Sequence, residues 1–146
     1  EWSSQPLGET QTGWDWFSLQ LSDGRELMYF QIRTEDGAIE PASSGSLILE
    51  DGSIQPLTRD DIQLKVLDQW TSPTTGGVYP TTWQLTIASQ QIDLTITALI
   101  PNQELNVSTV YWEGAVSATG NAADRPITAR GYVELTGYAG QRAPSV

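Results

Sequence analysis

The chain has 146 residues, a length that suits one domain, and 38% of them are hydrophobic while 17% are charged. It contains no cysteine and no histidine, which excludes disulfides, thiolate metal sites, cysteine nucleophiles and histidine-dependent acid–base catalysis. The net charge of −11, from 7 basic and 18 acidic residues, argues against binding to nucleic acid or to anionic lipid.

In the first half of the chain, apolar and polar side chains alternate with the period of two residues that is typical of strands. Asp-Gly and Ser-Asp-Gly sequences between the alternating runs are turn signals. The predicted strands cover residues 14–21, 26–33, 46–50 and 62–70. Within the segment that precedes the last of these strands, residues 58–61 could form one helical turn.

The second half continues the same pattern, with predicted strands at residues 81–88, 91–100, 110–118 and 129–139. About eight evenly spaced strands with one apolar face predict an all-β, antiparallel fold, either an up-and-down barrel of lipocalin-like (calycin) type or a two-sheet sandwich. A small barrel can hold one small ligand in its mouth. We expect a single domain over residues 1–146 with frayed ends at 1–12 and 140–146.

No segment approaches the ~20 consecutive apolar residues that a membrane span requires. The chain starts at Glu1 without a methionine or a signal peptide, so we expect a mature form or a piece of a longer protein. Neither a phosphate-binding loop nor any other motif indicates a cofactor. The acid–base chemistry of such a chain falls to carboxylates, tyrosine or lysine.

Asp15 is the first candidate for such chemistry. By alternation it shares the apolar face of its strand with Phe17 and Leu19, where burial would raise the pKa of its carboxyl group and suit it to general acid catalysis. The structural alternative is an Asp at the rim of the barrel that accepts a hydrogen bond from a backbone N–H. The neighbouring Trp14 and Trp16 fall on the opposite face, so both faces of this strand carry large apolar side chains that must pack against other parts of the protein.

Two further acids lie beside tryptophans. Asp68 precedes Trp70 and shares the parity of apolar residues on its strand, so it is either an interior acid or a rim residue that caps the loop at 71–77. Glu113 follows Trp112 and faces the other way, which favours a surface or interface position. Both are kept as candidate catalytic residues.

The last predicted strand carries polar and aromatic residues on its outer parity, namely Tyr132, Glu134 and Tyr138. Tyrosine buries well while its hydroxyl remains paired. This stripe therefore either covers a neighbouring element or domain, or forms cross-strand pairs on an exposed sheet face.

The sequence GWDWFSLQL at 13–21, followed by DGRELM at 23–28, resembles the opening of the C-terminal half of the AttH-like proteins. That family is also labelled carotenoid 1,2-hydratase-like, or lipocalin-like predicted secreted hydrolases. The resemblance continues in order through YWEG at 111–114 and GYVELTGY at 131–138, and it covers nearly the whole chain after Gly13.

This resemblance implies a lipocalin-like domain that is the second half of a two-domain protein, with the missing N-terminal half as its partner. The stripe of Tyr132, Glu134 and Tyr138, together with Trp14 and Trp16, would then meet that half. The "secreted" label implies a periplasmic or extracellular location.

Relatives include hydratases of acyclic carotenoids, in which a carboxylic acid protonates a double bond, aromatic faces stabilise the carbocation and water adds without a cofactor. On that reading Asp15 is the first candidate acid, with Asp68 and Glu113 after it. The predicted ligand-binding residues are the aromatics Trp14, Trp16, Trp83, Trp112 and Tyr29.

Two functions follow for this chain. In the first it binds an apolar, lipid-like or isoprenoid-like molecule and extends that binding to hydration or isomerisation. In the second it is a structural half-barrel with no ligand site of its own. A pocket lined by Trp83, Leu85, Ile96 and Asp15 would favour the first function, and an interior filled with side chains would favour the second.

Overall fold

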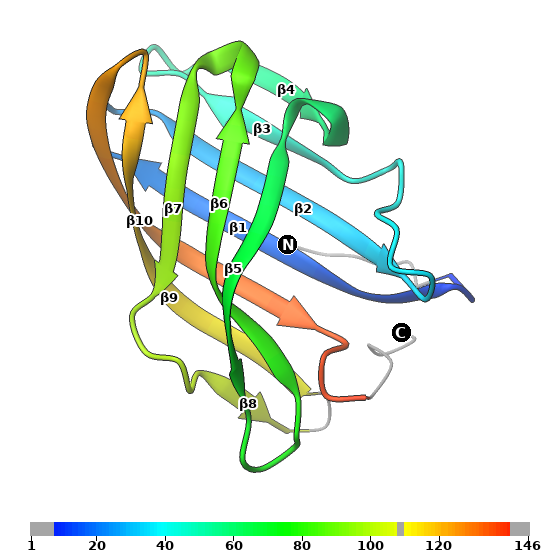
Figure 1. Ribbon diagram of the computed structural model, residues 1–146. Coiled ribbons are helices and arrows are strands. Elements are labelled where there is room, and N and C mark those ends of the chain that lie inside the picture. The colour runs from blue at the N-terminus through cyan, green and yellow to red at the C-terminus, as the bar shows by residue number, and fades with distance from the viewer. Residues whose placement is uncertain (1–7, 108–109, 141–146) are drawn as a thin grey trace.

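The computed structural model describes residues 8–107 and 110–140, which form one antiparallel sheet curled into a half-barrel (Figure 1). Its strands are β1 (Gln11–Leu21), β2 (Glu26–Thr34), β3 (Ser44–Ile48), β4 (Ile54–Thr58), β5 (Gln63–Thr71), β6 (Val78–Ile87), β7 (Ile92–Ala98), β8 (Glu104–Asn106), β9 (Val110–Ala122) and β10 (Arg125–Thr136). Two single-turn 3₁₀ helices, η1 (Arg59–Asp61) and η2 (Ala88–Gln90), complete the structure. None of the helices in this part of the chain is long and apolar enough to cross a membrane.

The all-β, antiparallel prediction is confirmed, with ten strands rather than about eight. The two additional strands are β4 and β8. β4 contains Pro56, which interrupts the strand pattern in the sequence, so this strand was not predicted. Because proline lacks a backbone N–H, it is confined to edge strands, and β4 is an edge of the sheet.

The predicted helical turn at 58–61 is present as η1. At the start of the chain Gln11 and Thr12 are part of β1 rather than frayed, whereas the expected fraying of residues 1–7 and 141–146 falls outside the described residues.

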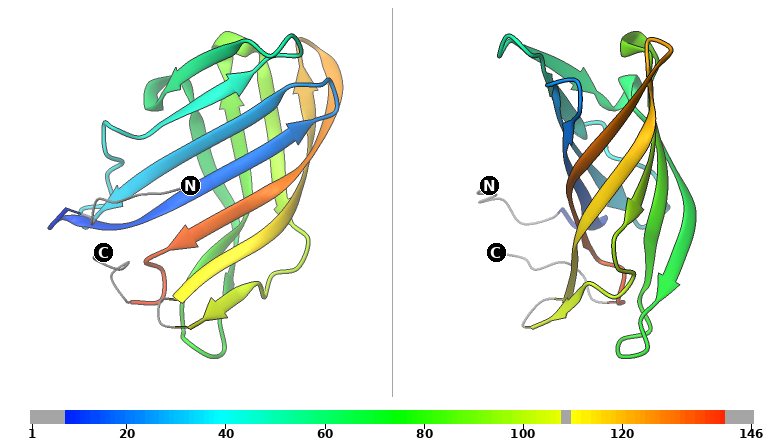
Figure 2. Two further views of the ribbon diagram at one scale, coloured as in Figure 1. Left: turned by 180° about the vertical axis from the view of Figure 1, so that it is seen from behind. Right: turned by 90° about the vertical axis from the view of Figure 1, so that its left-hand side faces the viewer.

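The strand order is β4-β3-β2-β1-β10-β9-β7-β6-β5, and β8 pairs with β9 beside this path. The edges of the sheet are therefore β4 and β5, which are consecutive in the chain and joined by η1. Figure 2 shows how the strongly twisted sheet brings its two ends around to face each other. The half-barrel is consequently open along one side, between β4 and β5.

The concave side of the sheet is filled by the protein's own side chains. Trp83 and Trp112 have 0% exposed surface, and their ring centroids are 6.3 Å apart. Phe17 on the central strand β1 meets Trp83 on β6 edge to face at 5.5 Å, a contact across the concave side of the sheet. Aromatic pairs of this kind add packing energy beyond the area that they bury.

The alternation in β1 is as the sequence predicts: Asp15, Phe17 and Leu19 are buried, while Trp14 and Trp16 lie half-buried on the convex face. The alternation predicted for β5 fails. Register shifts at Asp68 interrupt its pairing with β6, so that Asp68 is exposed rather than interior. A bulge of this type displaces side chains from the face that simple alternation assigns to them.

Candidate functional site

Asp15 lies at the centre of a group of polar side chains, here called the Asp15 cluster, which consists of Asp15, Gln31, Arg33 and Tyr138. Oδ2 of Asp15 accepts hydrogen bonds from the Gln31 amide at 2.8 Å and from the Tyr138 hydroxyl at 3.2 Å. Oδ1 accepts one from Nε of Arg33 at 3.1 Å. The Asp15 side chain is 3% exposed and that of Arg33 is 18% exposed, so the cluster holds a largely buried ion pair.

Backbone geometry brings these residues together from three segments. Asp15 and Gln31 are direct cross-strand partners in the β1–β2 hairpin. Gly13 leaves the space that Arg33 occupies, since a Cβ atom there would lie 2.8 Å from Nη2 of Arg33. Arg33 also donates to the carbonyl oxygen of Thr136, the last residue of β10.

Tyr138 does not lie on the outer face with Tyr132 and Glu134, as simple alternation predicted. The strand ends at Thr136, and Gly137 adopts a φ of 77°, which redirects the chain. The Tyr138 hydroxyl therefore reaches Asp15, and the Arg33 guanidinium lies 3.9 Å from the centre of the Tyr138 ring. This places Tyr138 in the Asp15 cluster and removes it from the outer stripe.

Burial raises the pKa of Asp15, while the charge of Arg33 and the three hydrogen bonds act in the opposite direction. Burial and the neighbouring Asp15 also raise the pKa of Tyr138. The carboxylate accepts hydrogen bonds from three donors, two on β2 and one in the segment after β10. Its hydrogen bonds tie β1, β2 and the segment after β10 together.

The raised pKa of Asp15 predicts a pH dependence of stability. The folded protein holds this proton more tightly than the unfolded chain, so the stability contributed by Asp15 is full below its ordinary pKa of 3.8 and is lost as the pH rises through the raised pKa. We expect the free energy of unfolding of the wild type to fall relative to that of Asp15→Asn as the pH rises above 3.8 toward neutral. Urea denaturation of both proteins across this range measures the difference. A difference that grew in favour of the wild type with rising pH would show that the Arg33 ion pair outweighs burial.

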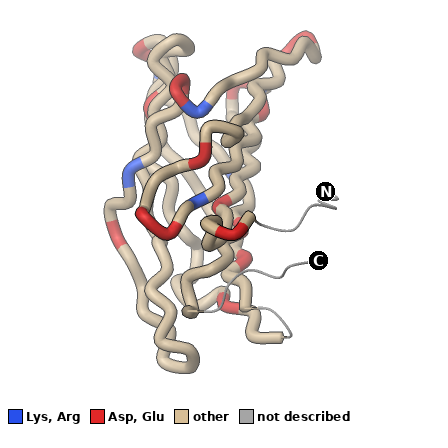
Figure 3. The backbone as a smooth tube through the Cα atoms, turned by 90° about the vertical axis from the view of Figure 1, so that its right-hand side faces the viewer, with Lys and Arg blue, Asp and Glu red and all other residues tan. Residues whose placement is uncertain are grey.

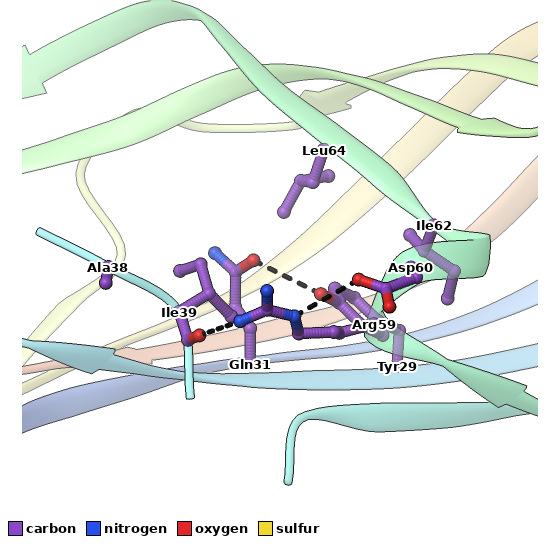
Figure 4. Close-up of a pocket in the computed structure, with 8 residues that line it drawn as sticks. All are labelled: Tyr29, Gln31, Ala38, Ile39, Arg59, Asp60, Ile62 and Leu64. Atoms are coloured by element: carbon purple, nitrogen blue, oxygen red, sulfur yellow. Dashed lines mark hydrogen bonds and ion pairs between the residues drawn. The ribbon is translucent and has the colours of Figure 1, made fainter. Parts of the chain in front are cut away.

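A pocket of about 390 Å³ lies in the gap between β2, with the connection after it, and η1 with the start of β5 (Figure 4). We call it the gap pocket. Its lining comes from β2, from the connection after β2, and from η1 and β5, and it consists of Tyr29, Gln31, Ala38, Ile39, Arg59, Asp60, Ile62 and Leu64. A volume of this size falls within the range of small-molecule sites.

The gap pocket adjoins the Asp15 cluster through Gln31, which lines the pocket and donates to Asp15. The Tyr29 hydroxyl donates to Oε1 of Gln31 over a long distance of 3.4 Å, so this bond is weak. Burial and the nearby Asp15 raise the pKa of Tyr29 to about 12, so its hydroxyl stays protonated and able to donate. Sequence reasoning missed Gln31, Arg33 and Arg59, although the first two share the parity of Tyr29 on β2.

The predicted ligand-binding aromatics are distributed over two faces of the sheet. Tyr29 lines the gap pocket, whereas Trp83 and Trp112 lie in the filled interior. Leu85 and Ile96, expected beside them in an interior pocket, also have no exposed surface. A side chain without any surface that water could touch lines no space in which a ligand could bind.

The remaining predicted residues lie on the convex face of β1, β10 and β9. The indole N–H of Trp14 donates to Glu134, and its ring meets that of Tyr111 edge to face at 6.3 Å. Glu113 lies directly opposite Glu134 in the sheet, and burial together with the nearby Glu113 raises the pKa of Tyr132. We call this surface the outer aromatic face: Trp14, Trp16, Tyr111, Glu113, Tyr132 and Glu134.

The charge distribution gives no indication of a metal site. Within residues 8–107 and 110–140, no group of three or more acidic side chains is arranged to hold a metal ion. Figure 3 shows acidic residues spread over the backbone, with few basic residues among them. The two arginines of the Asp15 cluster and the gap pocket, Arg33 and Arg59, are therefore local exceptions in an acidic protein.

Comparisons with known proteins identify the family. The AttH-like family model matches residues 1–138. A crystal structure of a protein described as AttH from Nitrosomonas europaea superposes with a TM-score of 0.81 at 36% identity, and the match covers 94% of this chain and 42% of that one. Kievitone hydratase from Nectria haematococca shares the fold with a TM-score of 0.72 at 19% identity, over 86% of this chain and 39% of its own. This chain thus spans about two fifths of the length of either relative, and no match was found among proteins with curated annotation.

Proposed function

Because the chain belongs to the AttH-like family, we propose that it is a lipocalin-like domain that binds an apolar small molecule, and that it does so in the gap pocket rather than inside the barrel. The observation that carries this proposal is the pocket of about 390 Å³ between β2 and the segment formed by η1 and the start of β5. Its lining combines apolar side chains with polar groups, and the polar groups contribute the larger share of the accessible lining.

The apolar part of the site consists of Ile39, Ile62 and Leu64, which come from both sides of the gap. The polar part consists of the Tyr29 hydroxyl, the Gln31 amide, the Arg59 guanidinium and the Asp60 carboxylate. Apolar walls provide affinity by burying ligand surface, and the few polar groups fix the orientation of the ligand. The side chains around Trp83 are fully buried, whereas the gap pocket offers space for a ligand.

Asp15 acts in this proposal as a positioning residue. Its carboxylate holds the Gln31 amide at 2.8 Å and is itself 3% exposed, so Gln31 stands between Asp15 and a bound molecule. Direct protonation of a ligand double bond requires contact between acid and ligand. The geometry therefore supports binding better than acid-catalysed hydration within this domain alone.

The proposal is tested by filling the pocket from its rim. Ala38 is exposed and lines the gap pocket, so Ala38→Trp would occupy the space without disturbing the core. We expect it to weaken binding of the neutral apolar dye Nile red at least tenfold, whereas Ala42→Trp, an exposed position that does not line the pocket, should leave binding unchanged. Titrations followed by dye fluorescence measure both affinities. Equal affinity of the wild type and Ala38→Trp would place the dye elsewhere.

A second function is favoured by the outer aromatic face. Both sides of β1 carry large apolar side chains, and on the convex side the indole N–H of Trp14 is already paired with Glu134 of the same face. This N–H therefore keeps its partner when the face is covered. Since this chain spans about two fifths of its relatives, the structural role is to support a companion domain that packs on this face.

A further inference from the structure

We infer that the molecule bound in the gap pocket is an amphipathic organic acid, whose carboxylate or other oxyanion is held by Arg59 while its apolar part lies against Ile39, Ile62 and Leu64. This inference rests on the proposed binding function and adds the chemical class of the ligand. It is drawn from the position of Arg59, its hydrogen-bonding groups and the neighbours that it has in the pocket (Figure 4).

The position of Arg59 is fixed by the local structure of η1. The side chain of Asp61 accepts hydrogen bonds from the backbone N–H and the hydroxyl of Thr58, at 2.8 and 2.7 Å. This capping box anchors the short helix directly after the edge strand β4. Arg59 is thereby presented to the gap from one side, opposite the residues that β2 contributes.

The guanidinium group retains donors for a ligand. Nη1 donates to the carbonyl oxygen of Ile39 and Nε lies 3.2 Å from Oδ1 of Asp60, while Nη2 has no partner among the residues that the structure describes. The Asp60 side chain is 86% exposed, so water competes strongly for this ion pair. A ligand oxyanion bound partly out of water could replace Asp60 and accept two parallel hydrogen bonds from the guanidinium.

A second donor points to the same class of ligand. The Tyr29 hydroxyl is close enough to Arg59 for the arginine charge to lower its pKa, against the larger effect of burial. Its bond to Gln31 measures 3.4 Å and can be exchanged for a shorter one to a ligand oxygen. Arg59 and Tyr29 thus offer donors to one acceptor group, while Asp15 fixes the neighbouring Gln31.

Because the protein carries a negative net charge, a ligand needs an apolar part in addition to its oxyanion in order to bind. A net charge of −11 repels small anions from the surface, so a single arginine is too weak a site for an inorganic anion. Burial of an alkyl or aromatic group against the pocket walls supplies the additional affinity. A molecule with an apolar body and one oxyanion head satisfies both parts of the site.

The experiment compares decanoate, decan-1-ol and decylamine, which share one chain and differ in the head group, by calorimetric titration of the protein. We expect decanoate to bind about tenfold more tightly than decanol, and decylamine more weakly than either. Arg59→Gln should abolish the preference for decanoate by weakening its binding about tenfold, with decanol changed less than twofold. Arg59→Lys should retain part of the preference, and Arg130→Gln, an exposed arginine on β10, should change nothing.

The outcomes separate this inference from the binding function on which it rests. Decanol that binds as tightly as decanoate, with neither affected by Arg59→Gln but both lost in Ala38→Trp, would overturn the anionic ligand and leave the apolar site intact. Failure of all three compounds to bind would overturn both. A decanoate preference that survives in Arg59→Gln would also overturn the assignment of Arg59.

Discussion

Asp15→Ala is expected to lower the free energy of unfolding by about 3 kcal/mol, because it removes the common acceptor of three side chains. Gln31, Arg33 and Tyr138 all donate to this carboxylate, and its side chain is 3% exposed. Each donor would be left without its partner in a site that water reaches poorly. The half-buried guanidinium of Arg33 is the most costly of the three, since it carries a charge.

Urea denaturation measures this loss as a shift in the midpoint at constant slope. Asp68→Ala is the matched control, because Asp68 is an exposed acid on the edge strand β5 and its removal should change stability by less than about 0.5 kcal/mol. An Asp15→Ala protein as stable as the Asp68→Ala protein would show that the cluster contributes little to stability.

The sequence predicted the central strands well because their side chains alternate between a filled interior and a half-buried outer face. In β1 the sequence alternates Asp15, Phe17 and Leu19 with Trp14 and Trp16 without interruption. The structure shows the same alternation between buried and half-buried side chains. In β5 the pattern looked equally regular, but the bulge at Asp68 on this edge strand changes which residues face inward. An edge strand has one neighbour to fix its register, so its alternation is a weaker guide.

The same reasoning could have found part of the Asp15 cluster. The turn at Ser22-Asp23-Gly24 sets the register of the β1–β2 hairpin, and this register places Gln31 directly opposite Asp15. The position of Arg59 in the pocket could not be predicted from such local rules. Arg59 reaches the pocket because the sheet curls until its two edges, β4 and β5, stand on one side of the barrel, which depends on the accumulated twist of all the strands.

Trp83→Ala is expected to lower the free energy of unfolding by about 4 kcal/mol, since it would leave a cavity in the filled interior. Trp83 has 0% exposed surface and packs edge to face against Phe17 on β1 and Trp112 on β9, so it connects side chains from three strands across the interior. Trp16→Ala is the matched control: the same side chain is lost from the outer face, where it is half-buried, and the cost should be roughly half as large. Thermal and urea denaturation of both variants measure the difference.

This pair of variants also decides where the domain holds a ligand. If Trp83 is a core residue, any Trp83→Ala protein that still folds should keep its affinity for Nile red in the gap pocket or gain a second site in the new cavity. If Trp83 instead lines a ligand site, the variant should lose dye binding while its stability changes little. The filled interior favours the first outcome, because a side chain that touches protein on all sides stabilises the fold through those contacts and has no surface left to offer a ligand.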